Sequence, residues 1–228
     1  MALNPVGIVC ALASEARHLR PTDGTLVITT GMGSSAASAG ARALVDAGAR
    51  ALASWGMAGG LDPSLPAGSI LLPDEIVGTD GRIHYSETGW RERLSATITA
   101  RSGRLLTSAK SVGSVEDKAA LFRSTGAVAV DMESAAIAEE AEQQGLPFLA
   151  VRVVVDSAGD VLPRAVSAAA DNEGHLHIWR LIGALALAPN ELAPLIRLAQ
   201  RYRAANRSLA TIARMGALAP SAFETRQS

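Results

Sequence analysis

The chain has 228 residues, of which 48% are hydrophobic and only 4% aromatic, and its formal net charge is −1. This length and apolar content predict one domain over residues 1–228, with a large core filled by Ala, Val and Leu. The net charge is close to zero, and the chain lacks the excess of positive charge that nucleic-acid-binding proteins carry, so we expect no nucleic acid partner. The single cysteine, Cys10, cannot form an internal disulfide, and no cationic signal-peptide segment precedes it, so we expect a cytoplasmic protein.

Apolar runs alternate with Ala-rich segments through the first part of the chain. In chain order they predict a strand over 6–12, a turn and helix start over 13–19, a strand over 25–30, a helix over 34–47, a strand over 51–55 and a glycine loop over 56–60. So many glycines in one loop indicate close backbone packing or unusual dihedral angles.

The alternation continues downstream. The predicted elements are a strand over 69–77, a helix over 90–100, a strand end over 105–108, a helix over 115–124, a strand and helix start over 127–138 and a strand over 149–155. Strands alternating with helices predict an α/β fold, in which helices flank both faces of a central, mostly parallel or mixed sheet. From about 181 to 228 the pattern changes to an extra helical tail of two helices, broken near Pro189 and Pro194.

The glycine motif Gly31-Met32-Gly33-Ser34-Ser35-Ala36 follows a predicted strand and begins a predicted helix. This matches the dinucleotide-binding pattern, but the next strand ends in Trp55-Gly56 and supplies no acid for a ribose, which disfavours a nicotinamide cofactor. Two interpretations remain open. Backbone N–H groups of the motif hold a phosphate or sugar oxygen, or the glycines only allow the helix to pack closely on the strand.

Two predicted strands end on acidic residues, and such strand ends are where α/β sheets bind ligands. Asp131 at a helix start is explained by capping alone. Capping does not account for Glu133, whose carboxylate is suited to accept hydrogen bonds from the vicinal hydroxyls of a ribose, with Met132 packed on the sugar face.

Asp156 ends the second of these strands, and Arg152 lies four residues before it on the same face. A buried arginine must find a carboxylate. Either the two form an ion pair that only orders the sheet edge, or burial raises the pKa of Asp156 and makes it a proton donor. Glu15 alone would be a helix-dipole partner. Only His175 and His177 among the histidines lie close together, so we expect no metal site.

Taken together, these segments resemble the nucleoside phosphorylase and nucleosidase superfamily. The motifs that resemble those of the methylthioadenosine/adenosylhomocysteine nucleosidases lie in order over about 6–160: residues 7–15, Thr30-Gly31-Met32-Gly33, residues 56–61, Asp131-Met132-Glu133 and residues 151–156. The resemblance implies a purine nucleoside phosphorylase-like fold.

The same resemblance implies roles for individual residues. Glu133 would bind the ribose hydroxyls, Met132 would line the sugar, Asp156 would protonate N7 of adenine and Glu15 would activate or position the nucleophile. Arg152 would support the site. The resemblance implies no metal or organic cofactor, and it implies a dimer or higher homo-oligomer that binds a small adenine nucleoside.

Departures from the nucleosidase pattern point to a subgroup. Gly31-Met32-Gly33, residues 56–63, Glu15-Ala16-Arg17 and the helical tail look more like the hopanoid-associated phosphorylases, whose implied substrate is adenosylhopane. Met57 replaces a usual hydroxyl residue, Val155 replaces a serine, and the segment 108–115 is about two residues shorter. The resemblance then implies inorganic phosphate as co-substrate. The expected anion-binding residues are Gly31, Gly33, Ser34 and Arg17, and the expected substrate contacts besides Glu133 are Asp131, Met132, Met57, Ala58, Gly59, Ser108 and Val112.

Several alternatives remain. Water would replace phosphate if Glu15 repels an anion, which gives a hydrolytic nucleosidase. A dinucleotide-dependent oxidoreductase and a non-catalytic nucleoside-binding scaffold are less favoured. The tail carries six arginines against two acids after Pro189, so it either touches a membrane surface peripherally or, as we favour, packs on the core with solvated arginines.

Overall fold

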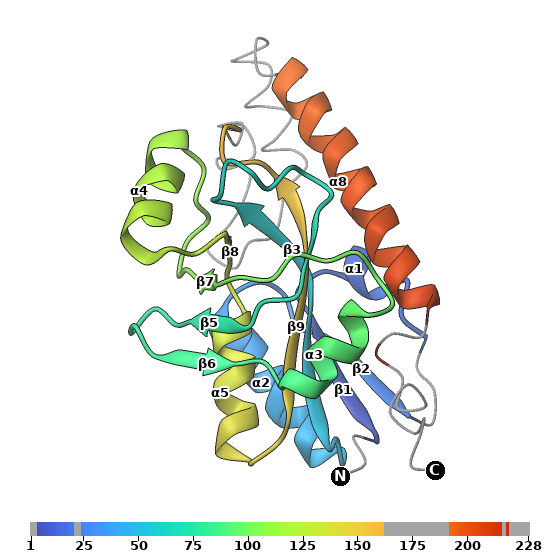
Figure 1. Cartoon of the computed structure of the whole chain (residues 1–228). Helices are drawn as coiled ribbons and strands as arrows, with labels where there is room; N and C mark the ends of the chain where they lie inside the picture. Colours follow the sequence, from blue (N-terminus) through green and yellow to red (C-terminus); the bar gives the residue numbers. More distant parts are fainter. Residues whose placement is uncertain (1–3, 21–23, 162–191, 216–217, 219–228) are drawn as a thin grey trace.

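The computed structural model describes residues 4–20, 24–161, 192–215 and 218 (Figure 1). The strands are Val6–Cys10 (β1), Thr25–Thr29 (β2), Ala51–Gly60 (β3), Ile70–Leu71 (β4), Glu75–Val77 (β5), Ile83–Tyr85 (β6), Leu105–Thr107 (β7), Ala129–Asp131 (β8) and Phe148–Asp156 (β9). The helices are Ala13–Ala16 (α1), Ser34–Asp46 (α2), Thr88–Ser95 (α3), Val115–Thr125 (α4), Ser134–Gln143 (α5) and Leu192–Arg214 (α8).

The strands form one mixed sheet, which confirms the predicted α/β class. The path runs β2-β1-β3-β8-β7-β5-β6, and the long strand β9 pairs with β3 and β4. β1 is parallel to β2 and β3, and β3 is parallel to β9, whereas β8 is antiparallel to β3. The carboxyl ends of β3, β8 and β9 therefore meet, because β8 pairs with β3 at Gly59 and Gly60, the end of that strand, and Asp156 at the end of β9 also pairs with Gly59; the other edge of β8 pairs with β7.

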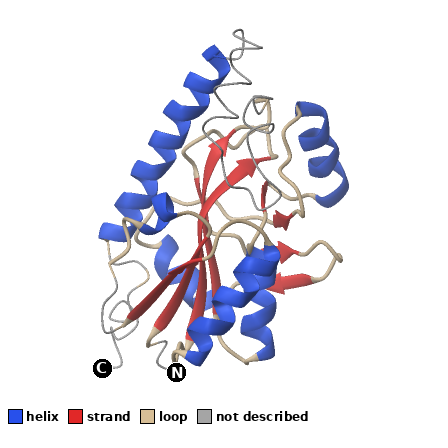
Figure 2. Cartoon of the chain, turned by 180° about the vertical axis from the view of Figure 1, so that it is seen from behind, coloured by secondary structure: helices blue, strands red, loops and turns tan. Residues whose placement is uncertain are grey.

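Helices cover both faces of the sheet (Figures 1 and 2). On one face α2 and α5 bury small and branched side chains, including Ala41, Leu44 and Ile137. Gly40 lets α2 approach closely, since a Cβ there would lie 2.2 Å from Cγ2 of Thr30. On the other face α8 packs along β9 and contributes buried Leu209 to a second core cluster.

Three sequence expectations differ from the structure. The predicted glycine loop at 56–60 is the second half of strand β3, and its glycines keep extended backbone while neighbouring groups pack against them. The predicted strand 69–77 is two short strands, β4 and β5. The chain does not break at Pro194, which lies within α8 as its third described residue.

The tail packs on the core over the part that the structure describes, as the favoured interpretation predicted. Ala205, Leu209 and Ile212 of α8 are buried, while Arg203 and Arg207 are exposed. Among the described residues, no helix has the length and apolarity needed to cross a membrane. The predicted break near Pro189 lies outside the described residues.

Candidate functional site

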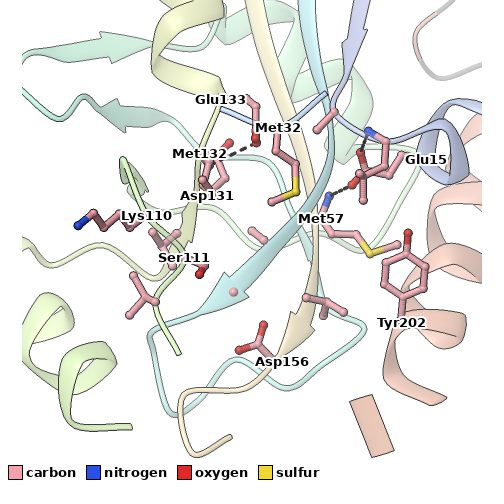
Figure 3. Close-up of a pocket in the computed structure, with 17 residues that line it drawn as sticks. Glu15, Met32, Met57, Lys110, Ser111, Asp131, Met132, Glu133, Asp156 and Tyr202 are labelled. Atoms are coloured by element: carbon pink, nitrogen blue, oxygen red, sulfur yellow. Dashed lines mark hydrogen bonds between the residues drawn. The ribbon is translucent and has the colours of Figure 1, made fainter. Parts of the chain in front are cut away.

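A cavity of about 230 Å³ lies where the carboxyl ends of β3, β8 and β9 meet (Figure 3). Carboxylates from three separate parts of the chain, Glu15, Glu133 and Asp156, line it. The remaining lining residues are Ala11, Leu12, Met32, Met57, Ala58, Gly59, Lys110, Ser111, Val112, Val130, Asp131, Met132, Val155 and Tyr202. All four acids expected from sequence, Asp131 included, thus share one cavity.

Glu133 is positioned by the glycine motif. It is the N-cap residue of α5, and its Oε1 accepts a hydrogen bond from the N–H of Gly33 at 2.9 Å. Gly33 has a φ of +97°, which favours glycine at this position. Burial, followed by the nearby Asp131 carboxylate, raises the pKa of Glu133 to about 7, while Arg152 opposes the rise. Glu133 therefore titrates close to neutral pH, with acceptor capacity left for a ligand.

Asp131 and Arg152 form a buried ion pair beneath the cavity. Arg152 donates to Oδ2 of Asp131 from Nε at 2.9 Å and from Nη2 at 2.7 Å. Thr107 donates to Oδ1, and the Ser134 N–H donates to Oδ2, which is a capping contact, although the N-cap position of α5 is held by Glu133 and not by Asp131 as predicted. Of the two alternatives for Arg152 and Asp156, the ion pair between them is wrong: a register shift in the pairing of β3 with β9, between Ala58 and Gly59, breaks the alternation that would put both on one face, and Arg152 pairs with Asp131 of β8. Protein donors therefore already bind both carboxylate oxygens of Asp131.

We expect Arg152→Met to lower the free energy of unfolding by about 3–5 kcal/mol, because it leaves the buried Asp131 carboxylate without its cation. Urea denaturation at pH 7.5 measures the change. Arg82→Met is the matched control, since Arg82 pairs with Glu139 at the surface and its loss should change the free energy by less than about 1 kcal/mol. Equal effects of the two substitutions would contradict a special role for the buried pair.

Glu15 is held by backbone N–H groups on both carboxylate oxygens. Leu12 donates to Oε2 at 3.0 Å and Met57 donates to Oε1 at 2.9 Å. A Cβ on Gly56 would lie 2.8 Å from Oε1, so only glycine allows β3 to pass so close to this carboxylate. Burial raises the pKa of Glu15, against the lowering effect of Arg152 and of the backbone donors.

Asp156 is the last residue of β9, and it forms a salt bridge with Lys118 of α4. Burial raises the pKa of the Asp156 carboxyl, and the Lys118 ammonium opposes that rise. Sequence reasoning missed Lys118, which sits in an ordinary helical pattern. An available signal was that Lys118 is one of only two lysines in a chain with 19 arginines.

Part of the cavity lining is apolar. Met57 and Tyr202 lie together beside Glu15 (Figure 3), and Met32 and Val155 also line the cavity. The hydroxyl groups of Tyr202 and Ser14 are hydrogen-bonded, which ties α8 to α1. The sequence analysis placed Tyr202 in an apolar stripe of the tail and did not connect it to the site.

Among the other expected substrate contacts, Met57, Ala58, Gly59, Met132 and Val112 line the cavity. Ser108 does not line it, and its hydroxyl donates to the carbonyl of Lys110 at 2.8 Å. Lys110 and Ser111 lie there instead.

The four expected anion-binding residues are not brought together. The Gly31 N–H donates to the carbonyl of Ala11, the Gly33 N–H to Glu133, and the Ser34 hydroxyl to the carbonyl of Met132. Arg17 lines a separate hollow beside α8 rather than this cavity. These donors of the glycine motif already bind protein acceptors, which argues against the interpretation of the motif as a phosphate-binding loop.

Within the described ranges, no group of three or more His, Cys, Asp or Glu side chains is arranged to hold a metal ion. The histidine pair at 175 and 177 lies outside them.

The chain is similar to known proteins in sequence and in fold. A 5′-methylthioadenosine/S-adenosylhomocysteine nucleosidase of Staphylococcus aureus (strain JH9) is 30% identical over 125 residues, which cover 45% of this chain and 55% of that protein. The chain thus spans about half the length of the curated relatives it matches.

Solved structures share the fold at lower identity. The S-adenosylhomocysteine nucleosidase of Streptococcus pyogenes, in complex with 5-methylthiotubericidin, has a TM-score of 0.68 at 18% identity, covering 93% of this chain and 95% of that one. The futalosine hydrolase of Helicobacter pylori has a TM-score of 0.65 at 16% identity, covering 93% and 98%. The family model described as "Phosphorylase superfamily" matches residues 17–182. The chain therefore belongs to the phosphorylase superfamily.

Proposed function

We propose that the protein cleaves the N-glycosidic bond of a 5′-substituted adenine nucleoside, with water as the attacking group. The observation that carries the proposal is the meeting of Glu15, Glu133 and Asp156 in one cavity at the strand ends. The nucleosidase names of the relatives support the same reaction class.

Each carboxylate has a distinct task in this proposal. Asp156 donates its proton to N7 as the C1′–N9 bond breaks, so the electron pair of that bond leaves on a neutral adenine. Glu133 accepts hydrogen bonds from the ribose diol. Glu15 takes a proton from the water that attacks C1′, and both glutamates stabilise the positive charge that develops on the sugar. The products are adenine and a free sugar, and the proton on Glu15 balances the one lost from Asp156.

The placement of the donors favours water over phosphate, which the subgroup resemblance had favoured. The Gly33 N–H and the Ser34 hydroxyl are already used by protein acceptors, and Arg17 lies outside the cavity. A phosphate would also sit beside the Glu15 carboxylate and be repelled by it. Lys110 is the cation that lines the cavity rim among the described residues, and it is exposed.

The apolar lining beside Glu15 supports an apolar 5′ substituent. Met57 and Tyr202 offer hydrocarbon surface there. A methylthio group and the long polycyclic group of adenosylhopane both meet this requirement. Adenine release from adenosine, methylthioadenosine and an adenosine with a long alkyl 5′ group tests the proposal. We expect a higher kcat/KM for both apolar substrates than for adenosine, and the highest rate on adenosine would exclude an apolar 5′ subsite.

We expect the affinity for a 7-deazaadenosine ligand to rise about tenfold between pH 6 and pH 8. The pKa of Glu133 is raised to about 7, so its ionised fraction grows over this interval, and only the ionised form accepts from both ribose hydroxyls. Isothermal titration calorimetry measures the change. The 7-deaza ring has no N7 acceptor, which removes Asp156 from the titration. The matching 2′,3′-dideoxy ligand should bind equally at both pH values, and a parallel rise for it would contradict the role of Glu133.

The predicted homo-oligomer, the cytoplasmic location and a peripheral membrane contact of the tail stay proposals. Light scattering of the purified chain tests the first, and co-sedimentation with anionic vesicles tests the last.

A further inference from the structure

Lys118 contacts the candidate site, yet the steps proposed above give it no part. It belongs to α4, and its side chain is fully buried, with a relative accessibility of 0%. A lysine so completely withdrawn from water is rare and costly unless its charge is paired and its donors are used. Its place beside Asp156 therefore calls for a physical explanation.

All three N–H donors of the Lys118 ammonium have acceptors at the end of β9. One is Oδ2 of Asp156, and the others are the carbonyl of Ser157 at 2.9 Å and the carbonyl of Asp160 at 3.0 Å. The same turn is closed by the Ser157 N–H, which donates to the Asp160 carboxylate at 2.8 Å. Lys118 thus fixes both the carboxylate of Asp156 and the backbone that follows it.

The two oxygens of Asp156 have different surroundings. Oδ2 is bound by Lys118, whereas Oδ1 accepts no hydrogen bond from the described residues. Gly59 of the neighbouring strand packs against the free oxygen, since a Cβ there would lie 3.4 Å from Oδ1. One oxygen is therefore anchored, and the other remains available to a ligand in the cavity that Asp156 lines.

We propose that Lys118 is the positioning residue of Asp156: its ammonium anchors Oδ2, leaves Oδ1 for the leaving base, and stabilises the carboxylate that remains once the proton has moved to that base. The proposal rests on the proposed function. In the chemical step the O–H bond of Asp156 breaks and an N–H bond forms on the base, while Lys118 keeps its own protons throughout.

The charges that face Asp156 define the expected change in pH dependence. Besides Lys118 they are Asp160, on the turn after β9, and Arg201 of α8, which pairs with Asp160 at 2.5 Å. Loss of the Lys118 ammonium leaves two carboxylates facing one arginine, so the pKa of Asp156 rises. Asp156 acts in its protonated form, and activity falls as the pH passes above its pKa. In a Lys118 variant, Asp156 therefore stays protonated to higher pH, but it is a weaker acid and gives up its proton less readily.

The test compares the full-length protein with Lys118→Met and Lys118→Gln, the second keeping N–H donors without the charge. Adenine release from methylthioadenosine is measured from pH 5 to pH 10. We expect kcat to fall about 10–100-fold, the basic limb to move up by at least one pH unit, and KM to change less than threefold. Arg123→Met, an exposed cation on the same helix, is the matched control and should leave the profile unchanged.

Two outcomes overturn the proposal: a kcat within threefold of the parent, or a lowered kcat with the basic limb unmoved, which marks Lys118 as merely structural. A second measurement tests Lys118 independently of the proposed function. It is the titration of the ¹³C carboxyl resonance of Asp156, which is assigned by its loss in Asp156→Asn. If no protein releases adenine, the proposed function fails. The Asp156 titration then decides alone, and a midpoint that moves by less than half a unit in both lysine variants overturns the role of Lys118.

Discussion

Asp156→Asn is expected to lower kcat for adenine release by about 10²–10⁴-fold, the range that a positioned general acid contributes. The amide keeps the shape of the carboxyl group but has no acidic proton, so adenine must leave as an anion. The substitution also leaves the buried Lys118 ammonium without its counter-ion, so we expect a lower melting temperature as well. Steady-state kinetics at a temperature well below the melting transition of the variant measures the chemical effect.

A substrate with an activated leaving group separates the loss of the acid from a damaged site. A 4-nitrophenyl riboside needs no protonation of its leaving group, so Asp156→Asn should cleave it within about tenfold of the parent rate. An activity on adenine nucleosides within tenfold of the parent would show that Asp156 is not the acid.

Glu15→Gln is expected to lower kcat about 10²–10⁴-fold on both the adenine nucleoside and the activated riboside. Glu15 has no contact with the leaving base in the proposed mechanism, so an easier leaving group cannot replace it. Its two oxygens both accept from backbone N–H groups, and a glutamine amide can satisfy only one of these donors. We therefore expect a measurable loss of stability, which thermal denaturation detects.

The contrast between Asp156→Asn and Glu15→Gln tests the different roles assigned to the two residues. Rescue of Asp156→Asn but not of Glu15→Gln by the activated riboside is the expected pattern. If the activated riboside rescues both variants, Glu15 does not activate the attacking water and serves only to hold the site.

The sequence was enough to predict which carboxylates share the site. Glu133 and Asp156 follow apolar runs, and the carboxyl ends of strands in an α/β sheet gather at one edge. Glu15 needed the family resemblance, because one glutamate at a helix start is most often a dipole partner. The structure also explains why position 56 is a glycine, since a side chain there would collide with the Glu15 carboxylate.

The partners of these groups could not be predicted. Arg152 lies four residues before Asp156, but a register shift in β9 separates their faces, and the Arg152 side chain reaches Asp131 on β8, which pairs with β7 and with the end of β3. Lys118 and Asp156 are 38 residues apart, and only the packing of α4 brings them together. Periodicity reports which face of an element is buried, and it carries no information about which distant charge meets that face.

The glycine-rich segments illustrate a second limit. The Gly33 N–H is a good donor for an anion at a helix start, as the sequence suggested, but the anion it binds is the Glu133 carboxylate of the protein itself. Tyr202 likewise reads as one more apolar residue in a helical stripe, and only tertiary packing of α8 places it at the cavity. Local pattern identifies the donor or the apolar group, while the tertiary fold selects its partner.

Product analysis by mass spectrometry, on methylthioadenosine with and without inorganic phosphate, tests the central claim most directly. Hydrolysis by the three-carboxylate site predicts adenine and free methylthioribose in equal amounts, at rates that do not depend on phosphate. Formation of a sugar 1-phosphate only when phosphate is present would contradict water as the attacking group. Absence of adenine under every condition, including with the long-chain 5′ substrate, would contradict cleavage of the N-glycosidic bond itself.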